Sequence, residues 1–315
     1  MSCGPDQRFP VKVFPWRRRG VLVPVHDRRS AALGVCMFTA SKPQVLAVQR
    51  ACFWGVRLLG ARVLPGRKQS WTAPFTPESW STLVQEWQSC VGAFDAMAIY
   101  QRRQAERDGL TLLLARAGAA VAVVKVRDDG AALQREQAAL AAVAAVGPTT
   151  FRAPRPMGSG SPAGDLHWSA QTCVFDRPHR PVFDASDLLF DEVRDCLEQV
   201  SGAHRGIGLA HNDLTPWNLR RDHRGVVWLY DWEDWGRAPA RADEVYFRAT
   251  SSALTGDPMP GGLPRAAAEY WRERVATRET STQPDLALSG RILAALDEAL
   301  RITVEPGAVF DSRLE

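Results

Sequence analysis

The chain has 315 residues, of which 45% are hydrophobic and 23% are charged. This composition is typical of an ordered protein large enough for one bilobal unit or two small domains, and it excludes a mainly disordered chain. The net charge of +4 is uneven, because residues 1–75 carry thirteen Lys and Arg residues but only two acids, Asp6 and Asp27. Such a segment indicates either an anionic partner or a solvated basic face.

The sequence carries no pattern for a metal-binding cysteine cluster, a secretory signal or a specific nucleic-acid motif. Its six cysteines include no C-x-x-C pair, which argues against a zinc site or a disulfide framework. The apolar segment from Val45 to Leu64 is interrupted by Arg50, Arg57 and Arg62, whereas a transmembrane helix needs about 20 mostly apolar residues. We therefore expect a cytoplasmic protein with reduced thiols and no transmembrane segment.

The first 75 residues are expected to form short strands and one helix. Residues 20–25 predict a strand, and residues 43–63 predict a helix. The spacing of its apolar residues predicts a buried stripe, which comprises Val45, Val48, Cys52, Val56 and Leu59. The alternative is a helix that lies on a membrane surface with its three arginines at the rim. The whole segment is either a docking subdomain or extra packing on the next lobe.

The remaining chain predicts strands first and helices later. Thr76 and Pro77 begin a helix, whose buried face comprises Trp80, Leu83, Val84, Trp87 and Val91. Strands follow over residues 96–101, 111–115 and 120–126, a helix over 131–146, and another strand within 166–175. From residue 185 onward the pattern is mainly helical, except around 211–235. This order favours an α+β protein with two lobes.

One stretch carries the pattern of a catalytic site, H-x-D-x-x-x-x-N, formed by His211, Asp213 and Asn218. An apolar run over residues 226–230 follows and ends at Asp231. A turn over residues 222–225 predicts a hairpin that brings Asn218 and Asp231 together at its open end. Two oxygen ligands at one point suit Mg²⁺. Asp213 lies just upstream, where it can accept a hydrogen bond from a hydroxyl group of an acceptor.

These residues, together with Trp232 and Glu233, resemble the catalytic and metal-binding loops of the aminoglycoside phosphotransferase and choline kinase family, within the protein-kinase-like superfamily. The resemblance covers residues 95–255. It implies that Asp213 is the catalytic aspartate, that Asn218 and Asp231 hold magnesium, and that Asp243 is structural. We interpret His211 as a residue that organises the backbone or the core, rather than as a general base.

Lys125 ends an apolar strand, and it resembles the lysine that contacts the ATP phosphates in kinases. A lysine in such a run needs charge partners, and the resemblance to the lysine–glutamate pair of kinases implies that Glu136 on the following helix is the best one. The alternatives are a lysine that reaches solvent and an exposed glutamate. The turn over residues 101–109 departs from the glycine-rich loop of kinases, because it has one glycine. Its arginines either bind phosphate or face solvent: Arg102, Arg103 and Arg107.

The resemblance implies a bilobal protein-kinase-like fold of the α+β class. We expect a basic N-terminal extension over residues 1–75, a small β-rich lobe over 76–178 and a mainly helical lobe over 179–315. The expected enzyme is an ATP-dependent phosphotransferase with an alcohol group as acceptor. It would use Mg²⁺ and act on a small hydroxylated molecule such as a sugar, an amino sugar or an amino alcohol. The alternative is a catalytically weak, kinase-like regulatory protein that binds nucleotide.

Two features near the predicted site bear on the acceptor. An acidic run suits either a cationic acceptor or a solvated helix face, and it comprises Asp184, Asp187, Asp191, Glu192, Asp195 and Glu198. Three tryptophans, Trp217, Trp232 and Trp235, either stack on a sugar or pack beneath the loops.

Overall fold

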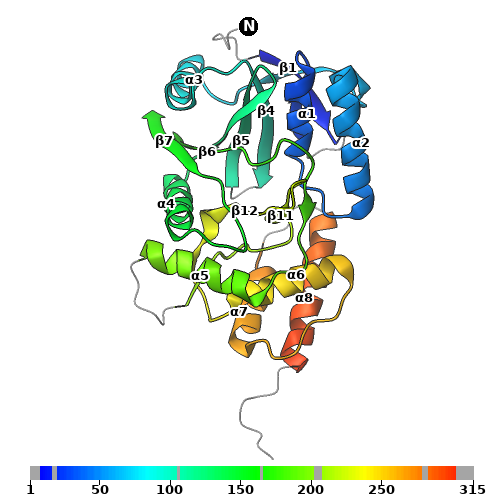
Figure 1. The fold of residues 1–315 in the computed structure, drawn as a ribbon, viewed down its shortest axis with the longest axis vertical. Helices are drawn as coiled ribbons and strands as arrows, with labels where there is room; N and C mark the ends of the chain where they lie inside the picture. The colour runs from blue at the N-terminus through cyan, green and yellow to red at the C-terminus, as the bar shows by residue number, and fades with distance from the viewer. Residues whose placement is uncertain are drawn as a thin grey trace, which may run out of the picture. The chain divides into compact units, whose positions relative to one another are not determined.

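The computed structural model describes residues 8–15, 20–104, 107–163, 166–201, 208–278 and 283–302, and it divides the chain into two compact units (Figure 1). The first unit comprises Met1–Val182 and Trp217–Asp234, and the second comprises Phe183–Pro216 and Trp235–Glu315. The first holds a large antiparallel sheet, and the second is mainly helical. The predicted α+β class, with a β-rich part and a helical part, is confirmed.

An eight-stranded antiparallel sheet organises the first unit, in the order β3-β1-β2-β4-β5-β6-β8-β7. The strands are β1 (Arg8–Phe14), β2 (Val21–Pro24), β3 (Gln69–Thr72), β4 (Ala96–Gln104), β5 (Arg107–Arg116), β6 (Ala119–Arg127), β7 (Pro156–Ala163) and β8 (Leu166–Gln171). A smaller sheet of the same unit joins β12 (Val227–Leu229), β11 (Leu219–Arg221) and β9 (Arg180–Pro181).

The turn expected over residues 101–109 is mostly strand, which corrects the sequence interpretation. Gln104 pairs with Arg107, so β4 and β5 continue almost to the tip of their hairpin. Residues 105 and 106 lie outside the described part of the chain, as do the side chains of Arg102, Arg103 and Arg107 that were considered as phosphate ligands.

The basic N-terminal segment supplies an edge of the large sheet. β1 pairs with β2 and β3, and β2 pairs with β4. The same segment adds α1 (Arg28–Cys36), α2 (Pro43–Leu59) and a 3₁₀ turn over Ala61–Val63. The contacts thus group this segment with the strands that follow it. The functional division at residues 75 and 178 stays a prediction.

Two hydrophobic cores lie against opposite faces of the sheet. On one face, α3 (Pro77–Val91) packs Trp80 and Trp87 against Leu112 and Leu114. On the other, α1 and α2 pack against Leu113. The alternation within β5 follows from the two-residue period of a strand, and Figure 1 shows α3 apart from the α1–α2 pair. Thr76 caps α3 as predicted, since its Oγ1 accepts from the Ser79 N–H at 3.2 Å.

The stripe predicted for α2 is wrong except at Val56, which is buried as predicted. The buried residues are Leu46, Gln49, Phe53 and Val56, whereas Val48 is 50% exposed and Leu59 is 71% exposed. Gln49 takes a core position because its amide donates to the carbonyl oxygens of Val35 at 2.8 Å and Phe38 at 2.7 Å. A buried polar side chain with such partners is stable. Because α2 carries apolar residues on several sides, their spacing alone does not identify the buried face.

The second unit packs helices around a small aromatic core. Its elements are α5 (Asp187–Ser201), α6 (Ala242–Thr255), α7 (Arg265–Ala276) and α8 (Gln283–Ile302), together with the strand pair β10 (Leu209–Ala210) and β13 (Gly236–Arg237). Tyr246 stacks on Trp271 with 3.8 Å between ring centroids, and the Trp271 indole donates to the Ala242 carbonyl. Of the helices described in either unit, none is sufficiently long and apolar to cross a membrane.

The acidic run predicted around α5 is largely a solvated helix face. Arg194 pairs with Asp191 at 2.8 Å and with Asp195 at 3.4 Å, and about half of each of these side chains is exposed. This arrangement matches the second of the two interpretations of the run.

The corrected face of α2 predicts where truncation destabilises the protein. Phe53→Ala should lower the free energy of unfolding by about 3–5 kcal/mol, because it leaves a cavity in the core. Val48→Ala on the same helix is the matched control and should change it by less than about 0.5 kcal/mol. Urea denaturation measures both, and a larger loss for Val48→Ala would support the stripe first predicted from the sequence.

Candidate functional site

A buried ion cluster lies at the end of β6. The Lys125 ammonium donates to Glu136 Oε1 at 2.7 Å, to Asp231 Oδ1 at 2.8 Å and to Glu233 Oε1 at 2.7 Å. Lys125 is only 5% exposed and Glu136 is fully buried. The structure therefore brings Lys125 and Glu136 together, and neither reaches solvent.

Local sequence explains how the two residues meet. Asp129 caps α4 (Gly130–Val146), because its carboxylate accepts from the backbone N–H groups of Ala131 and Ala132. Glu136 then occupies one position of the buried stripe of α4, which comprises Leu133, Glu136, Leu140 and Val143. A charged residue within an apolar stripe needs a partner of opposite charge, and Lys125 provides it.

The cluster extends to two residues that sequence reasoning did not assign. Arg127 donates from its guanidinium to Glu233 Oε1 at 3.0 Å, and both side chains are buried. Arg127 lies two residues after Lys125, on the same face of the strand, so the period of two could have identified it. Glu233 follows Asp231 by the same interval within a 3₁₀ turn over Trp232–Asp234.

The electrostatics of the cluster keep its lysine charged. Burial alone lowers the pKa of Lys125, but the carboxylates of Asp231, Glu136 and Glu233 raise it above the usual value. Burial raises the pKa of Glu136, and the ammonium of Lys125 opposes that change. The cluster holds three carboxylates and two cationic groups, so it keeps an excess of negative charge when all are ionised.

The predicted hairpin is present and carries Asn218 and Asp231 at its open end. Leu219 pairs with Leu229, and the Tyr230 N–H donates to the Asn218 carbonyl at 3.3 Å. Asp231 follows with a φ of +69°, a left-handed conformation that is strained for a residue with a Cβ. The buried indole of Trp232 packs near Phe151. This packing excludes Trp232 from stacking on a sugar.

Asp213 belongs to the second unit, in a loop that Asp243 organises. The Asp243 carboxylate accepts from the backbone N–H groups of His211 at 2.6 Å and Asn212 at 3.0 Å. The Asp213 N–H donates to Nδ1 of the buried His211 at 3.2 Å. Asn212 has a φ of +62° and accepts from the Tyr270 hydroxyl. These contacts hold the backbone at Asp213, whose side chain is half-buried.

The donor set of the ion cluster suits a divalent cation. One oxygen each from Glu136, Asp231 and Glu233 lies within 4.8 Å of the others. Glu136 Oε2 is buried, and it has no hydrogen-bond partner among the residues that the structure describes. Carboxylate oxygens are the ligands that Mg²⁺ prefers, so these residues fit such an ion. Lys125 lies at the same point and fits an anionic group such as a phosphate.

Among the known proteins compared with this chain, the matches are solved structures. No family model and no curated protein matches the sequence, whereas 87 solved chains match the structure. Aminoglycoside phosphotransferase APH(4)-Ia matches over 69% of this chain and 90% of its own, with a TM-score of 0.37 and 11% identity. A protein described as a fructosamine-3-kinase from Haemophilus somnus 129PT matches over 70% and 97%, with a TM-score of 0.40 and 9% identity.

A thermostable mutant of APH(4)-Ia in a ternary complex with ADP and hygromycin B matches over 70% of this chain and 89% of its own, with a TM-score of 0.35 and 11% identity. These proteins are phosphotransferases or kinases by name, as is the family that the sequence motif resembles.

Asp243 predicts a pH dependence of stability. Burial raises its pKa from 3.8 to about 7, although its hydrogen bonds to His211 and Asn212 act in the opposite direction. Between these values the folded state holds a proton that the unfolded chain releases, so Asp243 makes stability fall as the pH rises from about 4 to about 7. Asp243→Asn should therefore flatten this decline, as measured by urea denaturation across that range.

Asp257→Asn, which replaces an exposed aspartate of the same unit, is the matched control and should leave the slope unchanged. Equal slopes for wild type and Asp243→Asn would show that Asp243 does not titrate in this range.

Proposed function

We propose that the chain is an ATP-dependent phosphotransferase that moves the γ-phosphoryl group of Mg-ATP to a hydroxyl group of a small molecule, such as a sugar, an amino sugar or an amino alcohol. The observation that carries the proposal is the buried cluster in which three carboxylates surround Lys125 at 2.7–2.8 Å. A lysine paired with a helix glutamate, beside carboxylates that can hold magnesium, is the arrangement that kinases use for nucleotide phosphates.

Each residue has a role in this proposal. Lys125 binds the phosphates and Glu136 holds its ammonium in place. Asn218 and Asp231 hold Mg²⁺, and Glu233 lies close enough to join them. The bound metal supplies neutralisation of charge on the phosphate oxygens.

Asp213 acts at the acceptor. Its carboxylate accepts a hydrogen bond from the acceptor hydroxyl and orients that oxygen toward the γ-phosphorus. The new phosphorus–oxygen bond forms as the bond between the γ-phosphorus and the bridging oxygen breaks. The hydroxyl proton moves to Asp213, and ADP leaves with the electron pair of the broken bond.

The ion cluster also implies that partners change when nucleotide binds. Lys125 occupies oxygens of Asp231 and Glu233 that a metal would take. If these carboxylates held a metal ion, the Lys125 ammonium would be free to pair with the nucleotide phosphates. The excess negative charge of the cluster favours arrival of the cation, so nucleotide binding should depend on Mg²⁺.

This dependence is tested by thermal unfolding with ATP, in the presence and absence of Mg²⁺. A ligand that binds only the folded state adds about 2.7 kcal/mol of stability at a hundredfold excess over its Kd. Mg²⁺ should increase the stability that ATP gives to wild type, and Asp231→Asn should lose this increase. Asp213→Asn is the matched control and should keep it. A Mg²⁺-dependent increase that persists in Asp231→Asn would remove Asp231 from the metal site.

Transfer itself is tested by ADP release with panels of sugars, amino sugars and amino alcohols. Asp213→Ala should lower the rate by a factor of about 10²–10⁴, the usual contribution of general acid–base groups, while the thermal shift with Mg-ATP stays. Unchanged turnover would exclude Asp213 from the mechanism. Nucleotide binding without turnover by wild type on any acceptor would favour the catalytically weak regulatory protein.

A further inference from the structure

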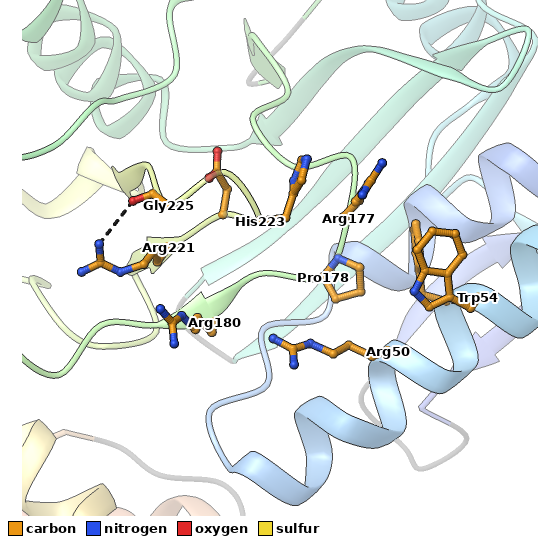
Figure 2. Close-up of a pocket in the computed structure, with 10 residues that line it drawn as sticks. Arg50, Trp54, Arg177, Pro178, Arg180, Arg221, His223 and Gly225 are labelled. Atoms are coloured by element: carbon orange, nitrogen blue, oxygen red, sulfur yellow. Dashed lines mark hydrogen bonds between the residues drawn. The ribbon is translucent and has the colours of Figure 1, made fainter.

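A second concave site in the first unit is lined by basic side chains. α2, the segment over residues 177–180 and the turn between β11 and β12 enclose a pocket of about 450 Å³ (Figure 2), a size typical of small-ligand sites. Its lining includes Arg50, Arg177, Arg180, Arg221 and His223, and none of its residues belongs to the Lys125 cluster. We infer that this pocket binds an anion that carries more than one phosphate group.

Among the residues that the structure describes, the four guanidinium groups have no carboxylate partner. Within the described ranges, none of the four arginines forms an ion pair. Arg221 donates to the Gly225 carbonyl at 3.2 Å, a bond drawn in Figure 2, and the Arg177 guanidinium lies 5.9 Å from the centroid of the Trp54 ring. Neither contact neutralises a charge, so the guanidinium groups remain able to bind an anion.

Strand pairing places two of these arginines opposite each other. β9 and β11 are antiparallel, and Arg180 lies directly opposite Arg221. Side chains at opposite positions of neighbouring strands have Cβ atoms about 5 Å apart, and like charges there are destabilising. A bridging phosphate would convert this repulsion into two charge-assisted interactions, since guanidinium groups bind phosphate oxygens in pairs.

The acidic residues near the pocket do not cancel its charge. Asp222 also lines it, but its carboxylate accepts from the backbone N–H groups of Arg224 at 2.8 Å and Val226 at 2.9 Å and from the Trp228 indole at 3.0 Å. These hydrogen bonds hold the Asp222 carboxylate within its own turn. Asp176 lies beside His223, with 3.5 Å between Oδ1 and Nδ1. Four arginines against one lining aspartate leave the pocket positive.

Buried contacts fix two walls of the pocket relative to each other, namely β11 and the segment over residues 177–180. Arg220, next to Arg221, donates from Nε to Nδ1 of His179 at 2.8 Å, and His179 lies between Arg177 and Arg180 in the chain. The Arg220 guanidinium also donates to the carbonyl oxygens of His179 and Ala40. Both side chains are almost completely buried. The binding arginines are therefore presented by a preorganised base, which lowers the entropy lost on binding.

The phosphate groups could belong to a soluble molecule or to a lipid headgroup. Beside the pocket, α2 exposes Trp54, Leu58 and Leu59, which are side chains that also suit a membrane interface. The recognised chemistry is the same in both cases, so the experiment has one arm for each source.

The first arm is calorimetric titration with inorganic tripolyphosphate in the absence of metal. Replacing the opposed pair, Arg180→Gln with Arg221→Gln, should weaken binding about tenfold or more, because charge-assisted hydrogen bonds are lost. The matched control, Arg67→Gln with Arg116→Gln, removes the same charge from exposed positions outside the pocket and should leave the affinity within about threefold. Arg180→Lys with Arg221→Lys should lie between them, because lysine cannot bind in a bidentate manner.

The second arm is cosedimentation with vesicles of phosphatidylcholine, alone or mixed with phosphatidylinositol bisphosphate, a lipid whose headgroup carries more than one phosphate group. Retention only on the mixed vesicles, lost in Arg180→Gln with Arg221→Gln, would identify a headgroup, and tripolyphosphate binding without vesicle binding would identify a soluble ligand. Thermal unfolding without ligand should show the double glutamine variant to be at least as stable as wild type, since a repulsion is removed. Undiminished binding of both probes by that variant, an equal loss in the control, or binding of neither probe by wild type would overturn the proposal.

Discussion

The buried ammonium of Lys125 is the constraint on which the polar interior of the first unit depends. A buried lysine is unstable without partners of opposite charge, and its three carboxylates come from α4 and from the segment after β12. The ion cluster thereby ties β6 to elements that lie far from it in the sequence. Loss of one partner from a buried ion pair typically costs about 3–5 kcal/mol. The same groups are therefore structural contacts and, in the proposed function, a preformed set of ligands.

Backbone strain occurs beside the residues proposed for catalysis and metal binding in both units. Asn212 and Asp231 both have positive φ values, and residues in sparsely populated conformations cost about 1–3 kcal/mol each. In the second unit, the Asp243 carboxylate binds two successive N–H groups at Asn212 and its neighbour. In the first, Asp231 is bound to Lys125 and followed by the buried Trp232. The surrounding contacts fix each backbone, so the carboxylates of Asp213 and Asp231 start from defined backbone positions.

Much of the arrangement of the ion cluster and the hairpin is predictable, because it follows from patterns within short segments of the sequence. A turn between two short strands was enough to predict the hairpin, whereas the Lys125–Glu136 pair was predicted from a lysine in an apolar strand together with the resemblance to the lysine–glutamate pair of kinases. The phase of α2 was not predictable from spacing, because Gln49 occupies its core face through hydrogen bonds to distant carbonyls. The pairing of β2 with β4 was missed for a related reason, since it joins strands more than 70 residues apart.

The basic pocket shows that a count of charges along the sequence can indicate a tendency to bind anions but cannot locate the binding site. The excess of positive charge is greatest before residue 75, yet only Arg50 of the lining arginines comes from that segment. The other three arginines come from residues 177–221, a segment that has no excess of positive charge. Arg180 and Arg221 become neighbours only through the pairing of β9 with β11. The buried contact between Arg220 and His179 then prevents the two strands from separating. Repulsion between two like charges that packing keeps close together lowers the stability of the folded protein. In our proposal, an anion that bridges the two guanidinium groups removes this repulsion.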